Sequence, residues 1–229
     1  MDQYIKYPTV DNLADYYNAF HGMAGFPKVS GCIDGTLVKI IAPTKYPHTF
    51  ICRKGFYAIN VQAVCGPKDE FTNIVAKWPG SAADSGIFNN SALCNKLESG
   101  EWKGILLGDK GYACKPYLLT PYKNPSSPSQ KRYNSRLTRT RVLIEQTFGR
   151  WKRRFSFLHS GSRLDPERTC RAIVTCAILH NIAVAKRMPV FEVNQDDAPD
   201  IFNDEVFMNN ENVAGLLFRD QFADHAFPV

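Results

Sequence analysis

Residues 29–41 read Val29-Ser30-Gly31-Cys32-Ile33-Asp34-Gly35-Thr36-Leu37-Val38-Lys39-Ile40-Ile41. The run is apolar and rich in β-branched residues, which is typical of a buried strand. Asp34 stands in its middle, just before Gly35, which loosens the backbone. An ionised carboxylate buried without a partner costs on the order of several kcal/mol. We therefore expect a cation beside Asp34, and a bound divalent metal is one candidate. The alternative is that Asp34 caps a turn at a strand end, as Asp-Gly often does.

The composition predicts one main domain. A chain of 229 residues that is 44% hydrophobic can bury a core of its own. Its seven cysteines are scattered and form no Cys-x-x-Cys pair, which favours reduced thiols in the cytosol or nucleus. The amino terminus has no signal-peptide core, and the longest apolar run, residues 172–185, is short for a membrane span. We expect a soluble protein that does not enter a membrane.

Charge is distributed unevenly along the chain. Residues 189–229 contain nine acidic residues and a single base, Arg219, so this tail carries −8 while residues 1–188 carry +14. A basic body is typical of proteins that meet phosphate backbones, although solvated basic faces also occur without a ligand. The tail also contains aromatic residues, so we expect it to fold back on the body or to bind a partner. We divide the chain into a helical segment at 1–29, a domain at 30–187 and an acidic tail at 188–229.

The residue pattern predicts an α/β fold. We expect strands at 29–41, 56–64, 71–78 and 103–108, and helices at 11–21, 81–97, 135–158 and 168–186. Residues 116–128 are expected to form a loop with a helical turn at 117–119. The first three strands are joined by short connections, so they form an antiparallel meander. We expect a mixed sheet of this meander plus a parallel strand, flanked by helices.

Two further acidic residues follow Asp34 along the chain. Asp109 stands at the end of the fourth strand, and Glu145, on the long helix, is the lone acid among nine basic residues between Lys131 and Arg154. If the helix crosses the sheet, three carboxylates meet in one place, which suits hard cations such as Mg²⁺ or Mn²⁺. Two such ions about 3.5–4 Å apart can activate a water and stabilise the leaving oxygen of a phosphodiester. The less specific interpretation is that Glu145 only balances local charge.

Several short motifs occur in a specific order along the chain. They are Gly31-Cys32-Ile33-Asp34-Gly35-Thr36, Arg53-Lys54-Gly55, Trp78-Pro79-Gly80-Ser81 with Asp84-Ser85, Leu106-Leu107-Gly108-Asp109-Lys110-Gly111-Tyr112, Leu119-Thr120-Pro121-Tyr122, Ile144-Glu145-Gln146-Thr147-Phe148-Gly149-Arg150-Trp151-Lys152 and Leu179-His180-Asn181. From about Tyr7 to Lys186 the chain thereby resembles the Harbinger transposase-derived nucleases, the DDE-type endonucleases of PIF/Harbinger transposons. The 35 residues between Asp109 and Glu145 fit that family's spacing.

The resemblance implies an RNase H-like fold, dependence on a divalent metal, DNA as substrate and a location in the nucleus, with the cytoplasm as a second compartment. It also implies a separate Myb-like DNA-binding partner. Two departures stand out. Leu37 occupies a position where many relatives have histidine, and the amino-terminal helical region of full-length relatives is absent, so we expect a fragment or a shortened copy.

Our hypothesis assigns roles to individual residues. Asp34 and Asp109 share the metals and Glu145 completes the site. Asp84 is a further candidate ligand, although it also suits the start of a helix, where a carboxylate interacts favourably with the helix dipole. Seven basic residues are predicted to contact DNA phosphates: Arg53, Lys54, Arg141, Arg150, Lys152, Arg153 and Arg154.

Three alternatives compete with a nuclease. A former transposase could be kept as a DNA- or protein-binding module without chemistry. Asp34-Gly35-Thr36 also resembles the first motif of haloacid-dehalogenase-type phosphatases, but their nucleophile would stand at Cys32, and an acid would be needed at Thr36 if Asp34 were the nucleophile. Cys176 and His180 have the spacing of zinc ligands on a helix, but no second pair is evident.

Overall fold

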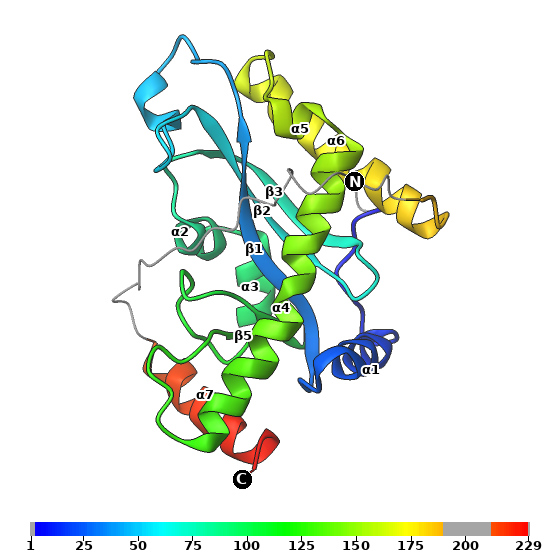
Figure 1. The fold of residues 1–229 in the computed structure, drawn as a ribbon, viewed down its shortest axis with the longest axis vertical. Coiled ribbons are helices and arrows are strands. Elements are labelled where there is room, and N and C mark those ends of the chain that lie inside the picture. The colour runs from blue at the N-terminus through cyan, green and yellow to red at the C-terminus, as the bar shows by residue number, and fades with distance from the viewer. Residues whose placement is uncertain (1–2, 190–211, 229) are drawn as a thin grey trace.

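The computed structural model describes residues 3–189 and 212–228. A mixed five-stranded sheet with the order β3-β2-β1-β4-β5 forms its centre (Figure 1). The strands are β1 (Val29–Lys39), β2 (Ala58–Cys65), β3 (Phe71–Pro79), β4 (Ile105–Leu107) and β5 (Leu118–Leu119). The first three form an antiparallel meander, β4 pairs parallel with β1, and β5 pairs parallel with β4. The predicted mixed sheet is confirmed, and the arrangement agrees with an RNase H-like fold.

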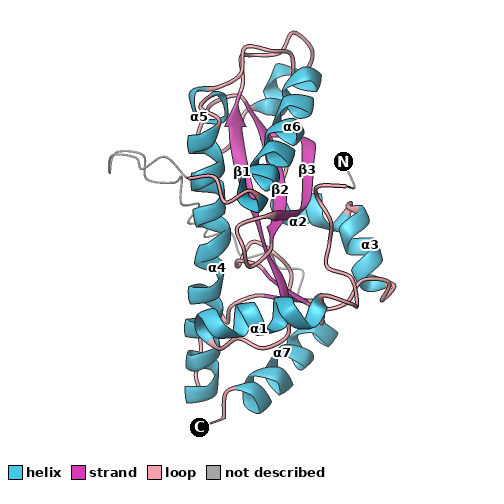
Figure 2. Ribbon diagram, turned by 90° about the vertical axis from the view of Figure 1, so that its right-hand side faces the viewer, coloured by secondary structure: helices cyan, strands magenta, loops and turns pink. Residues whose placement is uncertain are grey.

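Helices cover both faces of this sheet. They are α1 (Leu13–Ala24), α2 (Asp84–Asn89), α3 (Ala92–Glu98), α4 (Pro128–Arg154), α5 (Phe157–Ser160), α6 (Pro166–Ala185) and α7 (Val213–Ala226), with a 3₁₀ turn at Pro47–Phe50. Figure 2 shows α4 running along one side of the strands and α3 lying on the other. None of the helices in the described ranges is long and apolar enough to span a membrane.

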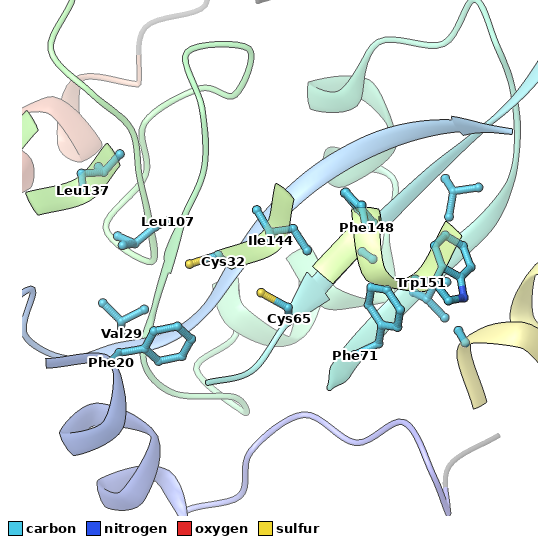
Figure 3. Close-up of a cluster of buried hydrophobic side chains, with 14 of the residues drawn as sticks. Phe20, Val29, Cys32, Cys65, Phe71, Leu107, Leu137, Ile144, Phe148 and Trp151 are labelled. Carbon is cyan, nitrogen blue, oxygen red and sulfur yellow. The ribbon is translucent and has the colours of Figure 1, made fainter. Parts of the chain in front are cut away.

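Alternation along the strands decides which side chains meet which helices. Successive residues of a strand point to opposite faces of the sheet. Cys32 and Leu107 pack in a large core cluster with Ile144 of α4 (Figure 3). Ile33 instead packs in a second cluster with Phe88 of α2. By the same alternation Asp34 faces α4, whereas Gly35 faces α2.

The long helix α4 is fixed by its cap and by an apolar stripe. The Ser127 hydroxyl accepts a hydrogen bond from the Gln130 backbone N–H at 3.1 Å, and Pro128 occupies the first turn, where its missing N–H costs nothing. Leu137, Ile144 and Trp151 recur at intervals of seven residues and are fully buried. The helix therefore presents one fixed face to the sheet.

Only part of the predicted tail can be assessed, because residues 190–211 lie outside the described residues. The helix α7 packs against α4 and β5 at the end of the molecule where the chain terminates (Figure 1). The Asp220 carboxylate accepts a hydrogen bond from the Tyr122 hydroxyl at 2.8 Å, and the Arg219 guanidinium lies 3.9 Å from the centre of the same ring. Phe222 stacks on Phe26 of the core. This part of the tail folds back on the body.

Several predicted boundaries are wrong for local reasons. The single helix expected at 81–97 is two helices, since the Ser91 hydroxyl accepts from the Cys94 N–H and caps a new start. The helical turn expected at 117–119 is the strand β5, because Leu118 and Leu119 pair with β4. The long helix begins at Pro128 rather than at 135 and ends at Arg154, before the separate helix α5.

Candidate active site

Asp34 lies near the middle of β1 on the face covered by α4. Its side chain is only 13% exposed. The Gly35 backbone N–H donates to Oδ1 at 2.8 Å, and Nη2 of Arg141 donates to Oδ2 at 2.6 Å. Both carboxylate oxygens are thus engaged, and the cation that the sequence requires beside Asp34 is, in this structure, an arginine of α4.

The Arg141 guanidinium lies between two acids. Its Nη1 is also 3.8 Å from Oε1 of Glu145, which is one helical turn further along α4. The Arg141 side chain is 11% exposed, and its Nε has no hydrogen-bond partner among the described residues. The structure places Arg141, one of the predicted phosphate contacts, between these two acids, where it compensates their charge. Glu145 is more open, with 32% of its side chain exposed.

Asp109 follows β4, which is the parallel neighbour of β1 in the sheet. Its carboxylate accepts a hydrogen bond from the Gly111 N–H at 2.9 Å, which fixes the turn that leaves the strand. The side chain is half-buried. Because neighbouring strands carry Asp34 and Asp109 and α4 carries Glu145, the fold brings the three predicted acids into one electrostatic environment.

Asp84 approaches the same strand from the opposite face. A Cβ placed on Gly35 would lie 2.3 Å from Oδ1 of Asp84, so the carboxylate rests directly on the glycine. The Asn60 amide donates to that oxygen at 2.9 Å, and the Gln62 amide donates to the Asp84 carbonyl at 2.9 Å and to the Tyr112 hydroxyl at 3.0 Å. Asp84 also begins α2, as expected for a carboxylate that interacts favourably with the helix dipole.

The acids perturb one another strongly. Burial raises the pKa of Asp34 to about 7, Arg141 opposes this rise, and the carboxylates of Asp109 and Asp84 add to it. Burial alone would lower the pKa of Arg141, but the nearby acids, Asp34 foremost, outweigh it and raise that pKa. Burial also raises the pKa of Tyr112, with Asp84, Asp34 and Asp109 contributing. The three aspartates, Arg141 and Tyr112 therefore lie close enough to influence one another's ionisation.

The donor set suits a hard divalent cation, since carboxylate oxygens are the ligands that Mg²⁺ and Mn²⁺ prefer. The structural observation that favours such an ion is that the carboxylates of Asp34 and Glu145 meet at one guanidinium, on the strand next to the one that leads to Asp109. As the side chains stand, however, residues 3–189 and 212–228 contain no group of three His, Cys, Asp or Glu close enough together to hold a metal. Asp34 and Glu145 both engage Arg141 instead.

The predicted phosphate contacts lie in different surroundings. Arg53 and Lys54 are exposed in the turn before β2. Nζ of Lys152 donates to the Leu37 carbonyl at 2.9 Å, near the end of β1. Arg150 forms an ion pair with Asp69. The remaining two, Arg153 and Arg154, are half-buried at the end of α4.

The other singled-out residues have structural roles. Leu37, which replaces the histidine of many relatives, packs with Cys52 and Ala58 in a small apolar cluster. His180, considered as a zinc ligand with Cys176, places Nε2 2.8 Å from the Asp69 carbonyl. No metal-binding group of the required size includes either zinc candidate among the described residues.

Sequence reasoning missed the polar support on the α2 face. Asn60 and Gln62 are 6% and 2% exposed, yet each carries an amide in an otherwise apolar strand. Their spacing of two residues places them on one face of β2, which was a usable signal. Tyr112 belongs to the motif at residues 106–112, but nothing in the local sequence indicated that its hydroxyl reaches this face from the turn after β4.

Comparison with known proteins agrees with this picture. A family model described as DDE superfamily endonuclease matches residues 33–181. "Putative nuclease HARBI1" from Homo sapiens is 31% identical over 194 residues, which cover 82% of this chain and 56% of the relative. The Xenopus laevis protein of that name is 30% identical over 226 residues, covering 95% and 63%.

A plant protein is also similar. "Protein ALP1-like" from Arabidopsis thaliana is 27% identical over 190 residues, which cover 75% of this chain and 47% of the relative. The chain thus spans about half the length of the curated relatives it matches. No solved structure matches it significantly.

Proposed function

Since the chain belongs to the DDE superfamily endonucleases, we propose that it is a divalent-metal-dependent nuclease that hydrolyses phosphodiester bonds in DNA. The proposed site consists of Asp34, Asp109 and Glu145. The observation that supports it most is the position of Arg141, which contacts the carboxylates of Asp34 and Glu145 and whose pKa is also raised by Asp109. Acids from β1, from the turn after β4 and from α4 thereby interact with the same guanidinium.

Each acid has a defined part in this proposal. Asp34 and Asp109 would hold the metal, and each accepts a hydrogen bond from a backbone N–H, of Gly35 and Gly111 respectively. Glu145, which is more exposed than Asp34, would complete the site. When bound, Mg²⁺ or Mn²⁺ would supply an activated water and stabilise the leaving oxygen. No side-chain nucleophile is required.

The proposed DNA path follows the carboxyl end of β1. Lys152 reaches the Leu37 carbonyl there, and Leu37 packs against Cys52, which directly precedes Arg53 and Lys54. Cations from α4 and from this turn therefore approach the same end of the strand. If Arg53, Lys54, Lys152, Arg153 and Arg154 each contact one phosphate, the logarithm of DNA affinity should fall with the logarithm of salt concentration with a slope of about −4 to −5. A flat salt response would contradict these contacts.

The nuclease proposal is tested by cleavage of plasmid DNA with Mg²⁺ or Mn²⁺. We expect the wild-type chain to cleave and the isosteric variants Asp109→Asn and Glu145→Gln to be inactive. Glu167→Gln is the matched control, because Glu167 is a 76% exposed carboxylate of α6 that pairs with the exposed Arg171, so loss of its charge should leave cleavage unchanged. Equal cleavage by all four proteins would indicate contamination and refute the proposal. DNA binding without cleavage by any of them would favour a binding module.

We also propose that the protein acts in the nucleus, where its substrate is located, and that a Myb-like protein guides it to DNA. The basic body and the acidic, aromatic tail offer surfaces of opposite charge for such contacts. A pull-down with the full chain and with a chain that lacks residues 189–229 shows which of these two surfaces binds the partner. Capture that depends on these residues would assign the contact to the tail, and capture of no DNA-binding protein by either form would contradict the proposal.

A further inference from the structure

The guanidinium of Arg141 stands where two proposed metal ligands meet. It donates to Oδ2 of Asp34 at 2.6 Å and lies 3.8 Å from Oε1 of Glu145. Arginine stays protonated at every accessible pH, so this positive charge is permanent. At 11% exposure it is shielded from solvent, which strengthens its interaction with both carboxylates.

This arrangement differs from a phosphate contact or an ordinary surface ion pair. A residue that tracks a DNA backbone presents its charge to solvent, whereas Arg141 directs its charge inward onto Asp34. The other oxygen of Asp34 is already bonded to the Gly35 N–H. A metal that approaches Asp34 therefore meets a carboxylate with both oxygens engaged and a like charge beside it.

We propose that Arg141 is a built-in counter-ion of the acid site, which holds Asp34 and Glu145 together in the metal-free protein and competes with a divalent cation for them. The inference rests on the proposed function. It makes Arg141 a positioning residue that sets metal affinity, and it explains why the described carboxylates do not form a closed metal site as they stand. Metal binding then requires the guanidinium to give up its contact with at least one acid.

The test measures Mn²⁺ affinity of the purified chain without DNA, by calorimetry and by the EPR signal of free Mn²⁺. Removing one permanent positive charge from a shielded site should tighten binding, so we expect Arg141→Gln to bind Mn²⁺ about tenfold or more tightly than wild type. Arg141→Lys keeps the charge and should remain close to wild type. Arg136→Gln is the matched control, because Arg136 lies on the same helix but donates to the Ala24 carbonyl.

A second measurement addresses the case in which Arg141→Gln does not fold. If Arg141→Gln is unfolded without metal, Mn²⁺ should restore its folded circular-dichroism spectrum, because the ion replaces the missing cation. Failure of Mn²⁺ to restore it would overturn the inference, as would equal Mn²⁺ affinity in wild type and Arg141→Gln. Asp109→Asn separates the two proposals: if wild-type chain binds Mn²⁺ and Asp109→Asn binds it equally well, the acid site itself is refuted.

Discussion

The contact between Gly35 and Asp84 gives a sharp test of how the site is packed. In Gly35→Ala the new Cβ would lie 2.3 Å from Oδ1, 2.6 Å from Cγ and 2.7 Å from Oδ2 of Asp84. Nonbonded atoms prefer about 3.5 Å or more, so the carboxylate must move by about 1 Å. That movement breaks its 2.9 Å hydrogen bond from Asn60. The φ angle of Gly35 is not in the left-handed region, so alanine brings no backbone strain.

The expected cost follows from these terms. Overpacking a tight site costs about 1–3 kcal/mol, and a lost hydrogen bond to a charged group costs about 1.5–3 kcal/mol. Alanine recovers about 0.4–1 kcal/mol by restricting the unfolded chain. We expect a net loss of about 2 kcal/mol or more in the free energy of unfolding and, for a chain of this size, a fall in Tm of about 4–8 °C. Urea unfolding monitored by tryptophan fluorescence measures the change in the free energy of unfolding.

A double-mutant cycle shows whether Asp84 is the cause. In an Asp84→Ala background the obstructing carboxylate is absent, so Gly35→Ala should cost less by about 2 kcal/mol. Gly86→Ala is the control: Gly86 lies on α2 with no atom within 4 Å of the new Cβ, and alanine there should stabilise the helix by about 0.5–1 kcal/mol. An equal cost of Gly35→Ala in both backgrounds would refute the packing of Asp84 on this glycine.

Three further predictions concern stability. In Gly215→Ala the new Cβ would lie 2.1 Å from the Cys114 carbonyl oxygen, so α7 should detach from the body. Limited proteolysis should then cut the chain near its end. A digest identical to that of the wild type would contradict this packing of α7. Asn181→Ala should cost about 3 kcal/mol in urea unfolding, because the amide serves both backbone groups of Phe71 and unsatisfied buried groups cost about 1–3 kcal/mol each; a cost below about 1 kcal/mol would refute it. Burial lowers the pKa of His180 below 6.5, so the unfolded state binds a proton more readily than the folded state does. The free energy of unfolding should therefore fall as the pH decreases from about 7 through the folded-state pKa. The variant His180→Gln should show a weaker dependence on pH.

The strands around the site were predictable because their signals are local. The apolar, β-branched run around Asp34 directly predicts a buried strand, and the short connections between the first three strands predict that they pair antiparallel. The strand β5 was missed because two leucines form a strand only by pairing with β4, and no local pattern records that partner. The split between α2 and α3 was missed because the Ser91 cap interrupts an otherwise helical pattern.

The role of Arg141 shows where sequence reasoning stops. Its spacing of four from Glu145 indicates that the two are neighbours on one helix face, but it does not indicate which face meets the sheet. A row of bases on a helix suggests phosphate contacts, and only the tertiary structure shows that this base faces a buried acid. Asp34 supplies the missing information, since a carboxylate inside a strand requires a cation and α4 is the element packed over it.

The stability of the core and the geometry of the site depend on the same helix. Arg141 and Glu145 flank Ile144, which is fully buried in the core cluster that also contains Cys32 of β1. Because a side chain packed to native density cannot shift without cost, the packing of Ile144 fixes where the guanidinium and the third acid stand relative to Asp34. The apolar face of α4 thus sets the distances on its charged face. In the proposed exchange of Arg141 for a metal ion, only the side chain of Arg141 would move, because the core fixes the backbone that carries it.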